Sequence, residues 1–270
     1  MKPLVIFEIA NNHMGDLNHG LKIIKTYYYI SKKYRKIIDF AVKFQFRDLD
    51  TFIHQDYLNT DHPQVKRFTD TKLTTLEWNK LINFSKRNFK IICTAFDEKS
   101  VESIIKKKFD YLKIASCSMD EWPLLEHIAK KAKSKKIICS LGGASLEEIR
   151  KTISFFSNRK MDVSYLYCVA KYPTNPKDLN LDFFNYLKSI YKDKIKGFSS
   201  HEMPDEKLSA SLAYAMGAKI FEKHVGLKSK KYNLNKYSTS PKQMDDWLSN
   251  LKLAIERCGT PQKRKKFTPM

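Results

Sequence analysis

Residues 4–15 read LVIFEIANNHMG, an apolar run, Leu4–Ile9, that only Glu8 interrupts before polar residues take over. The run is continuous rather than alternating, which is typical of a strand covered on both faces, as in a parallel sheet. Seven further runs of this kind follow: Phe40–Phe44, Ile91–Thr94, Tyr111–Ala115, Ile137–Ser140, Val163–Val169, Ile195–Phe198 and Lys219–Glu222. The sequence therefore predicts eight strands.

Amphipathic helical patterns lie between these runs. One apolar face consists of Leu17, Leu21, Ile24 and Tyr28, and a second repeats from Met244 to Cys258. Helix starts are predicted by four signals: the capping boxes Thr74 with Glu77 and Ser145 with Glu148, the pair Ser240-Pro241, and the triplet Pro204-Asp205-Glu206.

Eight strand–helix units over residues 1–258 predict a single-domain (β/α)8 barrel, the TIM barrel. A doubly wound open sheet is the alternative, but it usually has fewer strands. The segment 47–75 is too long for a simple loop, and we expect it to fold over the barrel mouth. The basic tail 259–270 lacks periodicity, so we expect it to be loose.

The composition excludes several classes of protein. The net charge is +21, but arginine supplies only eight of the 50 basic residues, and the lysines are scattered. Nucleic-acid binders usually concentrate arginine, so we expect no nucleic-acid partner, while the positive field favours small anions. No apolar run approaches the roughly 20 residues that span a bilayer. The N-terminus also lacks a secretory signal, so we expect a cytoplasmic protein without a membrane partner.

The cysteines indicate neither disulfides nor a zinc site. They stand at positions 93, 117, 139, 168 and 258, an odd number with wide spacings and no CxxC. The first four lie in or just after apolar runs, so we expect them to be small buried residues.

Polar residues end every predicted strand, and in a TIM barrel these ends face the active site. Lys43 and Lys113 are each flanked by apolar residues. A buried lysine needs an anionic partner or loses its proton, so two inward lysines indicate a pocket for a phosphate and a carboxylate. Its other members would be Thr94, Ser116 and Ser140. The alternative is that each lysine points outward and snorkels past the helices.

His201 ends the seventh predicted strand and His224 the eighth, so both imidazoles could share one metal. Two neutral imidazoles with water and substrate oxygens suit Mn²⁺, Mg²⁺, Fe²⁺ or Co²⁺ better than structural zinc. Glu8 and Glu222 are nearby carboxylates that could orient a ligand or a water. The alternative for each histidine is a hydrogen-bonded core role, and for His13 a substrate contact competes with a role in the turn.

Together these motifs resemble the N-acetylneuraminate (sialic acid) synthase family. The resemblance rests on EIANNHMGD, KFQ, TAFD, KIAS, CVAKYP, GFSSHE and FEKH, in that order, and covers about Val5 to Trp247. The family is a group of metal-dependent TIM-barrel transferases. Its members condense phosphoenolpyruvate with an N-acetylmannosamine-type aldose to give a nine-carbon 2-keto acid. The resemblance thus implies a role in surface-polysaccharide or nonulosonic-acid biosynthesis.

The resemblance also implies roles for single residues. His201 and His224 would bind the metal, usually Mn²⁺, with Mg²⁺ or Co²⁺ as alternatives. Phosphoenolpyruvate would be held by Lys43, Thr94, Lys113, Ser116, Ser140 and Ser199. The sugar and the attacking water would meet Glu8 and Gln45, and Asn12, His13 and Tyr172 would line that side. Glu222 would join Glu8 and Gln45 in the catalytic group.

The chain departs from the family pattern on the sugar side. Cys117-Ser118 stands where the family commonly has Gly-Glu, and Leu234 where it has an acid, with Asn233 or Asn235 as substitutes. The family's C-terminal antifreeze-like domain, which reaches the partner subunit's active site, is not in this sequence. That domain is either lost or encoded separately, which would make a separate sugar-binding domain protein a partner, and the resemblance to a usually dimeric family implies a homodimer. The competing functions are another aldol or lyase reaction, a non-catalytic anion-binding barrel, and nucleic-acid binding.

Overall fold

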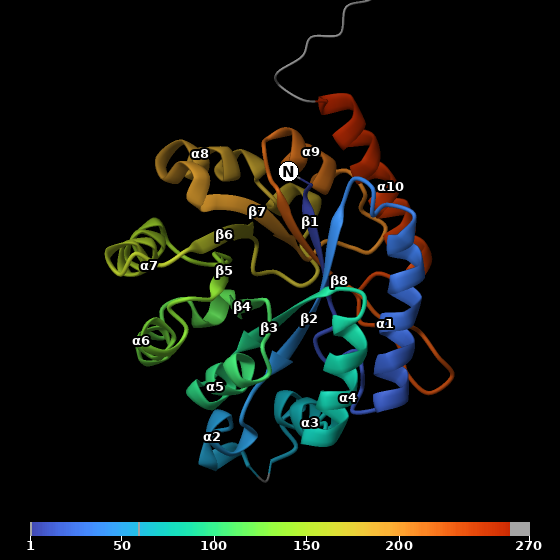
Figure 1. The fold of residues 1–270 in the computed structure, drawn as a ribbon, viewed down its shortest axis with the longest axis vertical. Coiled ribbons are helices and arrows are strands. Elements are labelled where there is room, and N and C mark those ends of the chain that lie inside the picture. Colours follow the sequence, from blue (N-terminus) through green and yellow to red (C-terminus); the bar gives the residue numbers. More distant parts are fainter. Residues whose placement is uncertain (1, 59, 260–270) are drawn as a thin grey trace, which may run out of the picture.

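The computed structural model describes residues 2–58 and 60–259, and its core is a closed barrel of eight parallel strands (Figure 1). The strands follow one another around the barrel in sequence order, and β1 closes it against β8. Their bounds are β1 (Leu4–Glu8), β2 (Asp39–Phe46), β3 (Lys90–Ala95), β4 (Tyr111–Ile114), β5 (Lys136–Ser140), β6 (Val163–Cys168), β7 (Ile195–Ser200) and β8 (Ile220–His224). The predicted (β/α)8 barrel is confirmed.

Helices surround the strands, with α1 and α10 side by side (Figure 1). Their bounds are α1 (Leu17–Lys32), α2 (Leu49–Phe52), α3 (Pro63–Asp70), α4 (Thr75–Lys86), α5 (Glu98–Lys106), α6 (Trp122–Lys131), α7 (Leu146–Asn158), α8 (Leu181–Tyr191), α9 (Ser209–Ala215) and α10 (Pro241–Cys258). Short 3-10 helices occupy Gln55–Tyr57, Ser116–Ser118, Pro176–Asp178 and Lys192–Lys194. No helix among the described residues is long and apolar enough to cross a membrane.

The helix-start predictions are confirmed in three places and wrong in one. Thr74 and Ser145 form complete capping boxes at α4 and α7, and Ser240 caps α10 ahead of its proline. The triplet at 204–206 does not begin a helix, because the chain needs these residues to pass from the strand end to the outer layer. Helix α9 begins at Ser209, and the Glu206 carboxylate accepts that residue's backbone N–H at 3.1 Å.

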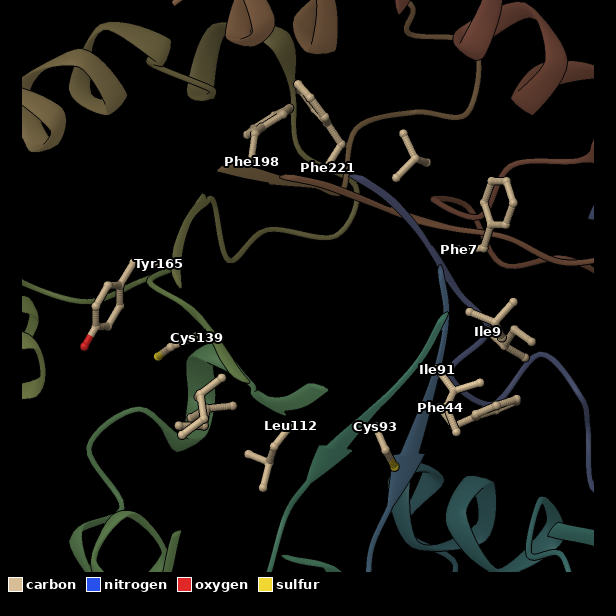
Figure 2. Packing of buried hydrophobic residues seen from close by; sticks show 14 of the residues in the cluster. Phe7, Ile9, Phe44, Ile91, Cys93, Leu112, Cys139, Tyr165, Phe198 and Phe221 are labelled. Atoms are coloured by element: carbon tan, nitrogen blue, oxygen red, sulfur yellow. The ribbon is translucent and has the colours of Figure 1, made fainter. Parts of the chain in front are cut away.

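The alternation of side chains along the strands divides the core in two. Outward residues pack between the sheet and the helices, among them Phe7, Phe44, Cys93, Leu112, Cys139, Tyr165, Phe198 and Phe221 (Figure 2). Inward residues form a smaller apolar layer inside the barrel: Leu4, Ile6, Ala41, Ile92, Ile138 and Leu166. The next inward positions toward the strand ends are polar, so the apolar layer is the floor of a polar cavity.

All five cysteines are free, as predicted, but they are not all in the same environment. Cys93, Cys139 and Cys168 are buried, whereas Cys117 is exposed. The prediction was wrong for Cys117 because β4 ends at Ile114 and the short helix Ser116–Ser118 carries the thiol out of the sheet.

The segment predicted to fold over the barrel mouth does so, through α2 and α3. The side-chain amide of Asn11 donates to Thr71 Oγ1 at 2.5 Å, and the Arg47 guanidinium lies 4.4 Å from the centre of the Phe68 ring. These contacts attach α3 to the ends of β1 and β2. His54 and His62 are exposed and cap short helices.

Gly197 of β7 is expected to tolerate no side chain. A Cβ at this position would lie 2.0 Å from the backbone oxygen of Ile220 on β8, so the two strands would have to separate. We expect Gly197→Ala to lower the free energy of unfolding by about 3 kcal/mol, measured by urea denaturation. Gly20→Ala in α1 is the control. Its Cβ meets only side chains, and we expect a change within about 1 kcal/mol. A stable Gly197→Ala barrel would contradict the strand spacing seen here.

Candidate active site

A cavity of about 340 Å³ opens at the carboxyl ends of the barrel strands. Eleven of the fourteen predicted site residues line it: Lys43, Gln45, Thr94, Lys113, Ser116, Ser140, Tyr172, Ser199, His201, Glu222 and His224. Strand register explains this convergence. Glu8 is paired with Lys43 on one side and His224 on the other, and Thr94 with Gln45 and Lys113, so inward residues meet at one level.

Lys43 lies at the centre of a buried charge network. Its ammonium forms ion pairs with Glu8 and with Glu222, the latter at 3.0 Å, and contacts Thr94 Oγ1 at 3.2 Å. Burial lowers the pKa of Lys43 to about 8, although the Glu222 carboxylate opposes that shift. Burial also opposes ionisation of Glu222, but Lys43 and Lys113 hold its pKa below the usual value. The cavity therefore keeps charged groups of both signs just above its apolar floor.

Lys113 lies in a different environment from Lys43. It is buried, and its ammonium donates to Ser140 Oγ at 2.6 Å and to the Ile114 carbonyl at 3.0 Å. Within the described residues it has no ion-pair partner. Beside it, Ser116 Oγ accepts the Gly142 N–H at 2.9 Å. A buried ammonium that is surrounded by hydroxyl groups and has no direct ion pair is a suitable site for an anion such as a phosphate or a carboxylate.

His201 and His224 face each other with ring centres 5.2 Å apart. Burial lowers the pKa of His201 to about 4 and that of His224 well below its usual value, so both imidazoles are neutral near pH 7. His224 Nδ1 is buried and has no hydrogen-bond partner within residues 2–58 and 60–259. Neutral imidazoles, one with a free nitrogen, fit a divalent metal.

The remaining ligands of such a metal would come from water or substrate. Within residues 2–58 and 60–259, no group of three or more His, Cys, Asp or Glu side chains is arranged to hold a metal ion. A site with two imidazoles leaves several coordination positions open, as Lewis-acid chemistry on a bound oxygen requires.

Three predicted residues are not among those lining the cavity. Glu8 is fully buried and forms an ion pair with Lys43. Asn12 donates through Nδ2 to the Val225 carbonyl at 2.8 Å and to Ser238 Oγ at 2.9 Å. His13 packs edge-on against Trp78 and accepts the Gly15 N–H at Nδ1. In this structure Asn12 and His13 therefore hold the loop after β1, and a sugar contact stays a prediction for both.

The two departures from the resembling family lie differently with respect to the cavity. Cys117 lines it, whereas Ser118 is buried outside it. Leu234 packs against Gly226, away from the cavity, and its neighbour Asn235 donates to Asn12 Oδ1 at 3.4 Å. Of the residues at these departures, only Cys117 therefore lines the cavity, and it brings a thiol and not a carboxylate.

Several lining residues escaped the sequence analysis, notably Arg67 of α3 and Tyr237 of the loop after β8. The Tyr237 ring lies 5.0 Å from that of His224 and 5.4 Å from that of Tyr172. Arg67 is exposed, and its guanidinium has no hydrogen-bond or ion-pair partner in the described parts of the chain. Arg67 lies on a short helix in the segment after β2 and Tyr237 in the loop after β8, so only their place in these two segments could have indicated them.

The fold and the site together define a barrel whose cavity places a buried lysine, Lys113, beside two facing histidines. The sequence model of the NeuB family matches residues 35–263, and the chain belongs to this family. It is accordingly a transferase of the synthase type.

Relatives with known names and structures support this assignment. The structure of spore coat polysaccharide biosynthesis protein E from Chromobacterium violaceum superimposes with a TM-score of 0.93 at 40% identity, over 98% of this chain and 79% of that one. The sialic acid synthetase of Leptospira borgpetersenii follows with a TM-score of 0.83 at 26% identity, over 98% and 88%. The pseudaminic acid synthase of Campylobacter jejuni is 30% identical over 83% of this chain and 65% of its own length.

Proposed function

We propose that this protein condenses phosphoenolpyruvate with a sugar aldehyde of the N-acylmannosamine type, giving a nonulosonic 2-keto acid and phosphate. The observation that carries the proposal is that one cavity holds both the paired histidines and Lys113, which has no ion-pair partner among the described residues. The names of the relatives, which include sialic and pseudaminic acid synthases, support the same class of product. Synthesis in the cytoplasm, for a surface polysaccharide, is part of the proposal.

Binding of phosphoenolpyruvate would use the anion site. Lys113 and the hydroxyls of Ser116 and Ser140 would hold its phosphate or carboxylate by charge-assisted and neutral hydrogen bonds. The second anionic group would approach Lys43, near the hydroxyls of Thr94 and Ser199. These donors are buried and fixed before the substrate arrives, so they need little reorganisation as charge develops.

The reaction forms a C–C bond and a C2–O bond to water and breaks the C2–O bond to phosphate, while the two protons of the water pass to the former aldehyde oxygen and to phosphate. C3 of phosphoenolpyruvate attacks the aldehyde carbon, which leaves cationic character at C2. Water adds at C2, and the tetrahedral intermediate expels phosphate. A divalent metal on His201 and His224, Mn²⁺ or alternatively Mg²⁺ or Co²⁺, would polarise the aldehyde oxygen as a Lewis acid.

The chain's own carboxylates would handle the protons. Gln45 donates to Glu8 Oε1 at 3.4 Å, so the two residues form a unit that can orient the water and accept its proton. Glu222 pairs with Lys43 and accepts from Ser199 Oγ, and it would stabilise the cationic character at C2.

The decisive experiment is an assay of phosphate release from phosphoenolpyruvate with Mn²⁺ across a panel of aldoses, including N-acylated and 6-deoxy sugars. We expect release with at least one acceptor and none after chelation. Turnover of a sugar substrate without phosphoenolpyruvate would favour another aldol or lyase reaction. Absence of both release and metal-dependent phosphoenolpyruvate binding would favour a non-catalytic barrel. A homodimer, or a separate sugar-binding domain protein, is the proposed source of further sugar contacts.

The pH dependence of kcat/KM for phosphoenolpyruvate should follow the ionisation of Lys43. Its ammonium binds the anion only while protonated, and its pKa is about 8, so kcat/KM should fall as the pH rises through that value. The fall should approach about tenfold per pH unit, in steady-state assays at saturating metal. In Lys43→Arg the guanidinium keeps its proton, so the fall near pH 8 should disappear. An unchanged alkaline limb in that variant would assign the titration to another group.

Replacement of Arg67 should raise KM for the sugar acceptor and leave KM for phosphoenolpyruvate almost unchanged. It comes from α3, in the segment that folds over the barrel mouth, and it lines the cavity together with Gln45 and Tyr237. We expect Arg67→Ala to raise KM for the sugar by about tenfold, the loss of one hydrogen bond to a charged donor, with KM for phosphoenolpyruvate within about twofold. Lys66→Ala, on the exposed face of the same helix, is the matched control. A rise confined to the phosphoenolpyruvate KM would contradict this placement.

A further inference from the structure

A second buried ion pair lies on the outer face of the barrel, where the proposed reaction does not use it. Lys223 of β8 points away from the cavity, with a side chain that is 0% exposed, and pairs with Glu202, 1% exposed, at 3.4 Å. The same ammonium donates to Ser200 Oγ at 3.0 Å and contacts the Glu202 carbonyl oxygen at 3.4 Å. Ser200 Oγ also hydrogen-bonds the Glu202 carboxylate. The pair is therefore part of a closed network.

The members of this network are the sequence neighbours of the two histidines. Lys223 precedes His224, and Ser200 and Glu202 lie on either side of His201. Because side chains alternate along a strand, the histidines point inward and their neighbours point outward. In the sheet Ser200 is paired with Lys223, so one ammonium joins the end of β7 to the end of β8.

The backbone around His201 is held by few other contacts. Strand β7 ends at Ser200, one residue before the histidine, so His201 lies beyond the last residue of its strand. Its carbonyl accepts the Thr174 N–H at 2.9 Å, and Glu202 forms an isolated bridge with the same residue. On the β8 side, the Lys223 ammonium is the side-chain group that reaches across to this segment.

Stability alone gives a weak reason for such a pair. Taking two charges out of water costs much of what their attraction returns, and apolar residues of similar volume are often as stable. One oxygen of Glu202, Oε1, is buried and has no hydrogen-bond partner in the part of the chain that the structure describes, so the network is not fully satisfied there either. A geometric role explains why charged groups join these two strand ends.

We propose that Lys223 and Glu202 are positioning residues that fix the distance and orientation of the His201 and His224 imidazoles for the metal. The inference rests on the proposed function, because it assumes that these histidines bind the metal. Neither residue touches the cavity, so both would act only through the backbone of their neighbours.

The test is metal binding by the full chain, with no substrate present. Mn²⁺ affinity is measured by calorimetry, and the geometry of the site by the visible absorption of bound Co²⁺. The variants are Lys223→Met, Glu202→Gln and the double variant Lys223→Met/Glu202→Gln. Each single variant leaves one buried charge uncompensated and is expected to unfold at a lower temperature. The double variant removes both charges and is expected to regain most of the wild-type melting temperature.

If the pair positions the histidines, the double variant binds Mn²⁺ about 10–100-fold more weakly than wild type and shows an altered Co²⁺ spectrum, although it is folded. The matched control is Lys135→Met. This lysine donates to the Phe109 carbonyl at 2.9 Å, in the turn before β5, and its loss should leave both readouts unchanged. A folded double variant with wild-type Mn²⁺ affinity and Co²⁺ spectrum would overturn the inference.

His201→Ala, measured in parallel, separates this inference from the proposed function. If it binds Mn²⁺ as tightly as wild type, the proposed metal site fails and the inference fails with it. If it loses the metal while the double variant keeps it, only the positioning role is wrong.

Discussion

Replacement of His201 or His224 by alanine should abolish phosphate release, with a rate at least about 10³-fold below wild type. Each change removes one of the two imidazoles available to the metal, and a Lewis acid contributes several kcal/mol of transition-state stabilisation. Metal content, measured by elemental analysis after dialysis, should fall with activity. The barrel should remain folded, because both rings face the cavity rather than the packed layer beneath the helices.

His127→Ala is the matched control. This histidine lies in α6 on the outside of the barrel, 3.5 Å from Glu102, and its loss should change neither metal content nor phosphate release. Wild-type metal content in both active-site variants would contradict the ligand assignment, even if activity were lost.

The second large effect is expected at Lys113. Lys113→Met should raise KM for phosphoenolpyruvate by about 10–100-fold, because a hydrogen bond to a charged group contributes about 1.5–3 kcal/mol. The free energy of unfolding should stay level or rise, since methionine replaces a buried ammonium that has no ion-pair partner among the described residues. Steady-state kinetics and urea denaturation on the same preparation measure both quantities.

A residue that serves binding is identified when its replacement weakens substrate binding but leaves the free energy of unfolding unchanged or raises it. Ser140→Ala, which removes the hydroxyl partner of the same ammonium, should weaken phosphoenolpyruvate binding less than loss of the charge does. An unchanged KM in Lys113→Met would place the anion elsewhere in the cavity. A loss of stability would mean that the ammonium has a structural role that the contacts seen here do not explain.

The barrel was predictable because its strands are buried on both faces. Their continuous apolar runs need no tertiary information to be recognised, and the capping boxes at Thr74 and Ser145 mark helix starts by local hydrogen bonds alone. The false helix start at Pro204 shows the limit of this reasoning. The same sequence signal also occurs in a segment that connects a strand end to the outer layer of helices. Only the three-dimensional path of the chain distinguishes such a connection from a helix start.

The cavity was predictable wherever a side chain belongs to a strand. Lys43, Lys113, Ser140 and Glu222 occupy inward positions that follow from alternation and strand register. Arg67 on the short helix α3 and Tyr237 in the loop after β8 were missed because both lie outside the strands, where strand register does not tell which side chain turns toward the cavity. Asn12 was assigned to the sugar side, yet its amide joins two loops that are far apart in the sequence. No local pattern reports such a contact.

The pairing of β1 with β8 has a consequence for how this chain is made. Leu4 pairs with Ile220, and Asn12 reaches Ser238, so contacts that close the barrel join the first and last parts of the sequence. During synthesis β1 is made before the other strands. Its edge that pairs with β8 stays unpaired until the seven later strands have been made. Such non-local closure raises contact order and slows folding, and an open apolar edge favours aggregation. Expression yield should therefore depend on how long the nascent sheet is protected before β8 arrives.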